Sequence, residues 1–184
     1  MTLSAWFDEL AEGDAFATPG RTITEADLVS FSALTGDWHP QHADAEWAGA
    51  GPFGERIAHG MLLLSYSLGL APIDPERVIA LRGLDSVRFK RPVRIGETIR
   101  VRGAVASLRP LDDASGLVTL DWRVVGAAER TALRAELQAI WRRRPEAAAG
   151  GCGASEQEAE PPAQNGGDPA AAELSPIQDG RVLV

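Results

Sequence analysis

The stretch HGMLLLSYSLGL, residues 59–70, decides the fold, because its apolar side chains point all round a helical wheel and do not mark one face. A helix that is apolar on every side is expected to be buried on every side. The apolar run MLLLSYSLGLA, residues 61–71, falls well short of the roughly 20 residues that cross a bilayer. We therefore predict a central helix enclosed by the rest of one domain, and no membrane segment.

Beyond this helix the hydrophobic period becomes two, which is typical of half-buried strands. Apolar and polar residues alternate in ETIRVRGAVAS (97–107) and in GLVTLDWRVV (116–125). The segment TALRAELQAIWRRR (131–144) fits a helix or a strand. We favour a strand, because the segments before it form a meander that needs a further partner. The pattern predicts an α+β fold, in which a long antiparallel sheet packs around the helix.

The residues before the central helix contain two patterns that predict the start of a helix. Thr24 and Asp27 form a capping-box pattern that opens EADLVSFSALTG (25–36), with Leu34 on the apolar side and a glycine at the end. Asp44 is a good N-cap for a further turn or two of helix. The segment between these two starts is predicted to be a polar loop.

The composition excludes several classes of protein. The 184 residues, 45% hydrophobic, suffice for one domain of ordinary size. A net charge of −8 and a pI near 4.9 lack the basic footprint of a nucleic-acid binder. The first residues show no leader pattern, so we expect a cytoplasmic protein. The single cysteine, Cys152, cannot form an internal disulfide, and we treat it as incidental.

A change of composition after residue 144 divides the chain in two. Residues 1–144 are expected to form the folded domain, whereas 145–184 are rich in Ala, Gly, Pro and Glu and contain no aromatic residue. Such a segment buries too little apolar surface to offset its ordering entropy. We predict that residues 145–184 are a disordered tail.

The polar loop LTGDWHPQHADAEW, residues 34–47, could be a metal site. It holds four potential ligands, Asp37, His39, His42 and Asp44. However, Pro40 and an extended loop would direct these side chains apart, and no cysteine or further cluster supplies other ligands. We therefore expect no metal.

The same loop could hold an acid/base pair. Asp37 and His42 can flank one water molecule across a loop bent by Gly36 and Pro40, which is what general acid/base catalysis requires. The alternative is that Asp37 closes the turn after Gly36 and His42 bonds only to backbone. Both interpretations are compatible with these residues taken alone.

The start of the central helix offers a second functional element. At Gly60 the first amide N–H groups lack helical partners, and the absent side chain lets a carbonyl oxygen approach them. An oxyanion site here, facing an acid/base loop, would suit chemistry beside a thioester carbonyl. For the side chain of His59 we expect a capping or packing role.

A basic group follows in VRFKRPVRIGE, residues 87–97. Its members could hold the phosphates of a nucleotide-bearing cofactor, or they could be solvated charges on a strand face. The candidates are Arg88, Lys90, Arg91 and Arg94.

The combination of these motifs resembles the MaoC-like dehydratases, a family that includes the (R)-specific enoyl-CoA hydratases. The matching motifs are TGDWHPQHADAEWA (35–48), RIAHGM (56–61) and VRFKRPVRIGETI (87–99), and the resemblance extends over nearly all of residues 10–144. It implies a hot-dog fold, usually dimerised so that two sheets join, and an acyl-CoA substrate. It implies no cofactor apart from the coenzyme A of that substrate.

The resemblance also implies a reaction. Asp37 and His42 would be the catalytic pair, and the Gly60 amide would bind the thioester carbonyl, so that water adds to a trans-2-enoyl-CoA to give an (R)-3-hydroxyacyl-CoA, or the reverse. A hot-dog thioesterase is the alternative within enzymes. A non-catalytic acyl-CoA or lipid-binding module is the alternative outside them.

Two positions depart from the family pattern. His39 stands where the family commonly has asparagine. Some members also use a serine further along the central helix, at the position of Leu68 here, and Ser65 and Ser67 lie nearby.

Overall fold

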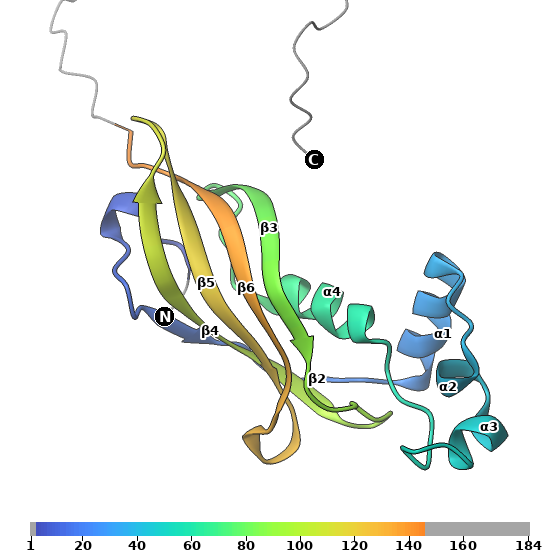
Figure 1. Cartoon of the computed structure of the whole chain (residues 1–184). Coiled ribbons are helices and arrows are strands. Elements are labelled where there is room, and N and C mark those ends of the chain that lie inside the picture. The colour runs from blue at the N-terminus through green and yellow to red at the C-terminus, as the bar shows by residue number, and fades with distance from the viewer. Residues whose placement is uncertain (1–2, 146–184) are drawn as a thin grey trace, which may run out of the picture. The chain divides into compact units, whose positions relative to one another are not determined.

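A curved antiparallel sheet forms one layer of the protein, which a computed structural model describes over residues 3–145. The strands lie in the order β1–β4–β5–β6–β3, and β2 pairs with the start of β4. Helix α4 (Gly60–Leu70) packs against this sheet, and the other α-helices gather near one end of α4 (Figure 1). The strands are β1 (Ala15–Ala17), β2 (Arg21–Thr22), β3 (Val78–Phe89), β4 (Thr98–Pro110), β5 (Ser115–Val125) and β6 (Thr131–Arg142).

The alternation in the long strands predicts their buried faces correctly. The segment that fitted both a helix and a strand is strand β6, and its alternate residues from Leu133 to Trp141 are buried. In β5 it is Val118, Leu120, Trp122 and Val124 that are fully buried. These faces form the core together with the leucines of α4, so the predicted α+β arrangement is confirmed.

The prediction that α4 is buried on every side is wrong for the single chain. Leu62, Leu63 and Leu64 are buried, but Met61 is 54% exposed, and Ser65 and Gly69 on the same stripe are exposed too. The stripe follows helical spacing, so it is one continuous face of α4. The sheet of one chain covers only the opposite side, which leaves this apolar helix with an open face.

Three helices precede α4, and two of them begin where the sequence indicates. Helix α1 (Glu25–Thr35) has the capping box of Thr24 and Asp27, and α3 (Ala45–Gly49) is capped by Asp44. Helix α2 (Pro40–Ala43) lies in the segment predicted as a loop. The prediction for Leu34 is also wrong, because this residue is 83% exposed. Two 3₁₀ turns, η1 (Phe7–Glu9) and η2 (Ala127–Glu129), complete the elements.

A polar network around Asp27 ties α1 to β2 and α4. Its carboxylate accepts hydrogen bonds from Tyr66 Oη at 2.7 Å, from Arg21 Nη2 at 2.9 Å and from the backbone and side chain of Thr24. Burial of the carboxyl raises its pKa, but the hydrogen bonds that it accepts, led by the one from Tyr66, lower the pKa by more. The net pKa is about 2. The network therefore stabilises the ionised form of Asp27.

One buried hydrogen bond joins α4 to the sheet. The Trp122 indole N–H donates to Ser67 Oγ at 2.9 Å, and that hydroxyl donates to the Leu64 carbonyl at 2.7 Å. The hydroxyl of Ser67 is thus engaged in two hydrogen bonds within the core. Ser65 is exposed, and Leu68 packs against the core. None of these three residues lines the pocket described below.

Within residues 3–145, no helix combines the length and the apolarity that a bilayer crossing needs. Residues 146–184, which make up all but the first residue of the predicted disordered tail, lie outside the described part of the chain.

Candidate active site

A pocket of about 470 Å³ lies between α2, the start of α4 and the segment that begins at the end of β3, residues 89–93. Asp37, His42, His59 and Gly60 lie in its lining, together with apolar side chains that include Phe53, Leu63 and Phe89. Two separate predictions, the acid/base loop and the helix start, thus meet in one cavity. A mostly apolar pocket with a few convergent polar groups is the usual form of a small-molecule site.

Helix α2 presents His42 to this pocket. His39 is the N-cap and Pro40 takes the first position of α2, where a missing N–H costs nothing. The prediction that Pro40 and an extended loop direct the polar side chains apart is therefore wrong: Pro40 starts a helical turn that places His42 beside Asp37. His42 Nδ1 lies 2.7 Å from the Ile57 carbonyl oxygen, which can only accept, so Nδ1 carries the hydrogen. Nε2 is thereby free for chemistry.

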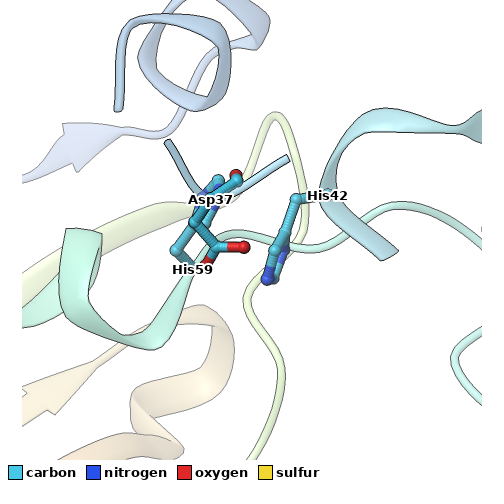
Figure 2. A group of neighbouring side chains, drawn as sticks. All are labelled: Asp37, His42 and His59. Carbon is cyan, nitrogen blue, oxygen red and sulfur yellow. The ribbon is translucent and has the colours of Figure 1, made fainter. Parts of the chain in front are cut away.

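Asp37 lies between α1 and α2 with its carboxylate directed toward His42 (Figure 2). Its Oδ1 accepts a hydrogen bond from the His39 backbone N–H at 3.2 Å, which fixes the loop. Side-chain N or O atoms of Asp37, His42 and His59 lie within 4.8 Å of one another. A single water molecule can therefore contact both Asp37 and His42. The hydrogen bonds expected from the alternative are also present, since Asp37 bonds to the turn and His42 to a backbone carbonyl, and both side chains line the pocket in addition.

The third member of this group is His59, which precedes α4. It does not cap the helix with its side chain. Instead, its Nε2 lies 3.1 Å from the carbonyl oxygen of Asp37, and its ring stacks on that of His42 with centroids 3.8 Å apart. Of the two roles expected for His59, packing is correct and capping is not.

The arrangement of the rings disfavours a metal ion. Ligand atoms of Asp37, His42 and His59 lie within 4.8 Å of one another, as in a metal site. However, an ion bound by both histidines must lie close to the plane of each ring, and two stacked rings whose planes are 27° apart with centroids at 3.8 Å make such a point hard to reach. His39 has a different task, since its Nδ1 accepts from the Gln41 backbone N–H at 3.2 Å and its ring packs edge-on against Trp47. Asparagine is also a good N-cap, which explains why histidine can replace it here.

Gly60 begins α4 in the pocket wall. Within residues 3–145 its N–H has no hydrogen-bond acceptor, as expected for the first turn of a helix. A Cβ at this position would lie 2.7 Å from the ring of Phe89, so a larger residue here would require that ring to move. Gly60 thus offers an N–H without an acceptor in the pocket lining, and the Phe89 ring occupies the space that its missing side chain leaves.

The structure separates the four basic candidates. Arg91 forms a half-buried pair with Glu97 at 2.6 Å and 3.1 Å and also contacts the Arg130 carbonyl. Burial raises the pKa of the Glu97 carboxyl, and the hydrogen bonds, first that of Arg91, outweigh it, so that the net pKa is lowered. Arg94 pairs with Glu55.

The other two cations are less engaged. Arg88 donates to the carbonyl of its neighbour Val87. Lys90 is exposed, lines the pocket, and has no acidic partner within residues 3–145. The four cations therefore do not act as one patch.

Some site residues were not predicted from the sequence. Phe89, at the end of β3, lines the pocket and covers Gly60, and Gln41 and Phe53 line it from the helices and the loop after them. The signal for Phe89 was its place directly before the basic run KRP, at the point where a strand ends. Gln41 and Phe53 carry no comparable signal.

Known proteins resemble this chain in sequence and in structure. A family model described as MaoC like domain matches residues 9–124. Protein MaoC of Klebsiella aerogenes is 45% identical over 100 residues, which are 53% of this chain and 29% of that protein. An (R)-specific enoyl-CoA hydratase of Rhodospirillum rubrum is 35% identical over 108 residues, 57% of this chain and 72% of that one.

A solved structure gives the name of the fold. A Mycobacterium tuberculosis protein described as a double hotdog fold superposes with a TM-score of 0.69 at 24% identity, covering 79% of this chain and 46% of that chain. At this identity the likeness concerns the fold alone, and it confirms the predicted hot-dog fold. Together with the family match over residues 9–124, it establishes that this chain belongs to the MaoC-like family.

Proposed function

We propose that this chain is a hydratase/dehydratase that adds water to a trans-2-enoyl-CoA to give an (R)-3-hydroxyacyl-CoA, or catalyses the reverse reaction. The observation that carries the proposal is the convergence of Asp37, His42 and the free Gly60 N–H on one pocket. The names of relatives support it, since the Rhodospirillum rubrum protein is an (R)-specific enoyl-CoA hydratase and a Methylorubrum extorquens relative is a 3-hydroxybutyryl-CoA dehydratase.

The proposed mechanism begins with a water molecule held between the Asp37 carboxylate and His42 Nε2. Asp37 takes a proton from this water as its oxygen bonds to the β-carbon, and the double-bond electrons move toward the thioester carbonyl. The Gly60 N–H stabilises the negative charge on that oxygen. The α-carbon then takes a proton from the same pair, which restores Asp37 and His42.

This reaction is redox-neutral, because one O–H bond of water and the π bond of the enoyl group are broken while one C–O and one C–H bond are formed. The proposed steps use only Asp37, His42 and the Gly60 N–H, so the proposal includes neither a metal nor a redox cofactor, and coenzyme A enters only as part of the substrate. Dialysis against a chelator is expected to leave turnover unchanged. Loss of activity that an added metal ion restores would contradict this part of the proposal.

The pocket entrance suggests where the coenzyme A phosphates bind. Lys90 is the strongest candidate, because it lines the pocket and is unpaired within the described residues. Arg88 is a second candidate outside the pocket lining. Arg91 and Arg94 are engaged with Glu97 and Glu55, so in this proposal they act by holding loops in place.

We also propose that the protein works as a homodimer. Strand β3 ends the sheet, pairs only with β6 among the described strands, and exposes Ile79 and Leu81. Met61, on the open face of α4, adds a further exposed apolar side chain. A second copy of the chain would cover such a surface. Light scattering is expected to give twice the 19.6 kDa of one chain; a monomer at micromolar concentration would contradict the proposal.

A cytoplasmic location, predicted from the sequence, belongs to the same proposal. Fractionation of cells that produce the protein tests it. Recovery of the protein in the membrane fraction would contradict it.

The catalytic proposal is tested with crotonyl-CoA, by following the loss of enoyl absorbance. Asp37→Asn keeps an oxygen that accepts from the His39 N–H, and His42→Asn keeps an N–H near the Ile57 carbonyl, so both changes preserve the local fold. Each is expected to lower kcat by about two to four orders of magnitude, the scale of general acid/base groups.

A matched control comes from the neighbouring helix α3. Glu46 is exposed and lies outside the pocket, so Glu46→Gln should leave turnover unchanged. Unchanged turnover in both site variants would refute the catalytic pair. Release of free thiol from the substrate would instead identify a thioesterase. Binding of acyl-CoA without any turnover would identify a non-catalytic binding module.

A further inference from the structure

His59 differs from Asp37 and His42 in its burial. It is only 2% exposed, whereas Asp37 is exposed and His42 is half-buried. Although His59 lies in the pocket lining, little of its side chain is accessible to a substrate, and the proposed mechanism gives it no proton to carry. Its contacts therefore need a separate explanation.

These contacts reach both members of the proposed catalytic pair. A backbone carbonyl can only accept, so the Nε2 of His59 carries a hydrogen and donates it to the Asp37 oxygen at 3.1 Å. Ser32 Oγ of α1 lies 3.2 Å from the same nitrogen. The ring faces His42 at 3.8 Å, and Phe31 packs nearby with its centroid at 5.0 Å. His59 thus holds the Asp37 loop by its backbone and His42 by its ring (Figure 2).

The surroundings of His59 favour its neutral form. Burial lowers the pKa of His59 most strongly, the hydrogen bond to the Asp37 carbonyl raises it, and the charge of the neighbouring His42 lowers it, with a net lowering. Its Nδ1 is buried and has no hydrogen-bond partner in the described chain, so a second ring proton would lack an acceptor. The titratable groups that face it are Asp37 and His42, with His39 beyond His42.

We propose that His59 is a positioning residue which, as the neutral tautomer with hydrogen on Nε2, sets the separation between Asp37 and His42. Its effect on turnover rests on the proposed function. The physical reason for such an effect is that a misplacement of about 1 Å in a reacting group can slow catalysis about a hundredfold.

Three variants separate the two contacts of His59. His59→Leu removes both, His59→Gln restores an N–H at the reach of Nε2, and His59→Phe restores a ring face for His42. We expect kcat for crotonyl-CoA to fall about a hundredfold in the leucine variant, with KM changed less than about threefold. The other two variants should each recover about tenfold. The control Glu46→Gln should match the wild type.

The outcome is decided by these rates. A leucine variant within threefold of the wild type would overturn the proposal, as would glutamine and phenylalanine variants no faster than leucine. Thermal unfolding, measured in parallel, shows which variants are folded at the assay temperature.

A second measurement needs neither substrate nor variants. Nitrogen-15 NMR of the histidine rings in the full-length wild-type protein at pH 8.5 should show His59 as the Nε2–H tautomer and His42 as the Nδ1–H tautomer, and the pKa of His59 should lie below the ordinary value for histidine. A His59 pKa at or above that ordinary value, or hydrogen on its Nδ1 at pH 8.5, would overturn the proposal. If the wild type lacks hydratase activity, the proposed function fails and this measurement alone decides the role of His59.

Discussion

Replacement of Asp27 by asparagine tests the network that connects α1, β2 and α4. The pKa of Asp27 falls from the ordinary 3.8 to about 2 in the folded protein, and its side chain is only 11% exposed. At about 1.4 kcal/mol per pKa unit, the preference for the ionised form contributes about 2 kcal/mol of stability at neutral pH. Asp27→Asn keeps the size and the acceptor oxygen but removes the charge, so it should lose about this amount.

The pH dependence gives the sharper test. Because the folded pKa is depressed, the contribution is complete above about pH 5, where the unfolded carboxyl is ionised, and disappears as the pH falls toward 2. The difference in unfolding free energy between wild type and variant, from urea titrations at one protein concentration, should follow this course. Other carboxyls are common to both proteins and cancel in the difference.

Asp113→Asn is the matched control, since Asp113 is exposed and no hydrogen bond to its side chain is found in the described chain. It should change stability little at any pH. A difference for Asp27→Asn that is constant from pH 7 to pH 3, or that stays below about 0.5 kcal/mol at pH 7, would refute the assignment.

Two further predictions concern the site wall and the proposed dimer. Gly60→Ala puts a methyl group 2.7 Å from the Phe89 ring. In the crotonyl-CoA assay this variant should raise KM or lower kcat about tenfold or more. The double variant Gly60→Ala/Phe89→Ala should recover part of that loss. If the double variant is no better than Gly60→Ala, Phe89 is not the obstacle. Leu81→Arg places a charge on the exposed side of the edge strand β3, so the mass measured by light scattering should fall toward that of one chain. The control Arg88→Ala should leave the measured mass unchanged. An unchanged mass for Leu81→Arg would exclude this face as the dimer contact.

The strands could be predicted because their burial follows local alternation. In β6, Leu133 and Leu137 fit both a helix and a strand, and the need for a partner beside β5 correctly favoured the strand. Helix α2 could not be predicted in this way, because four residues that begin with a proline carry no periodicity. The open face of α4 was missed because the sequence shows that a helix is apolar and does not show what covers it.

The site could be predicted in part. Residue type and spacing made Asp37, His42 and Gly60 candidates, the family resemblance implied their roles, and the structure brings them to one pocket. The engagement of Arg91 by Glu97 could not be foreseen, since an arginine free to bind phosphate and one held in an ion pair have the same sequence signature. The contacts of His59 depend likewise on how three elements meet in space.

The hydrogen bond between Trp122 and Ser67 fixes the rotational phase of α4. Apolar contacts between leucines and a sheet tolerate small rotations of a helix, because one methyl group can replace another. A single indole N–H that reaches a single hydroxyl allows only one setting. Turning the helix by one residue, about 100°, would break this bond and swing Gly60 out of the pocket wall. A contact deep in the core thereby helps to determine which amide lies in the pocket wall.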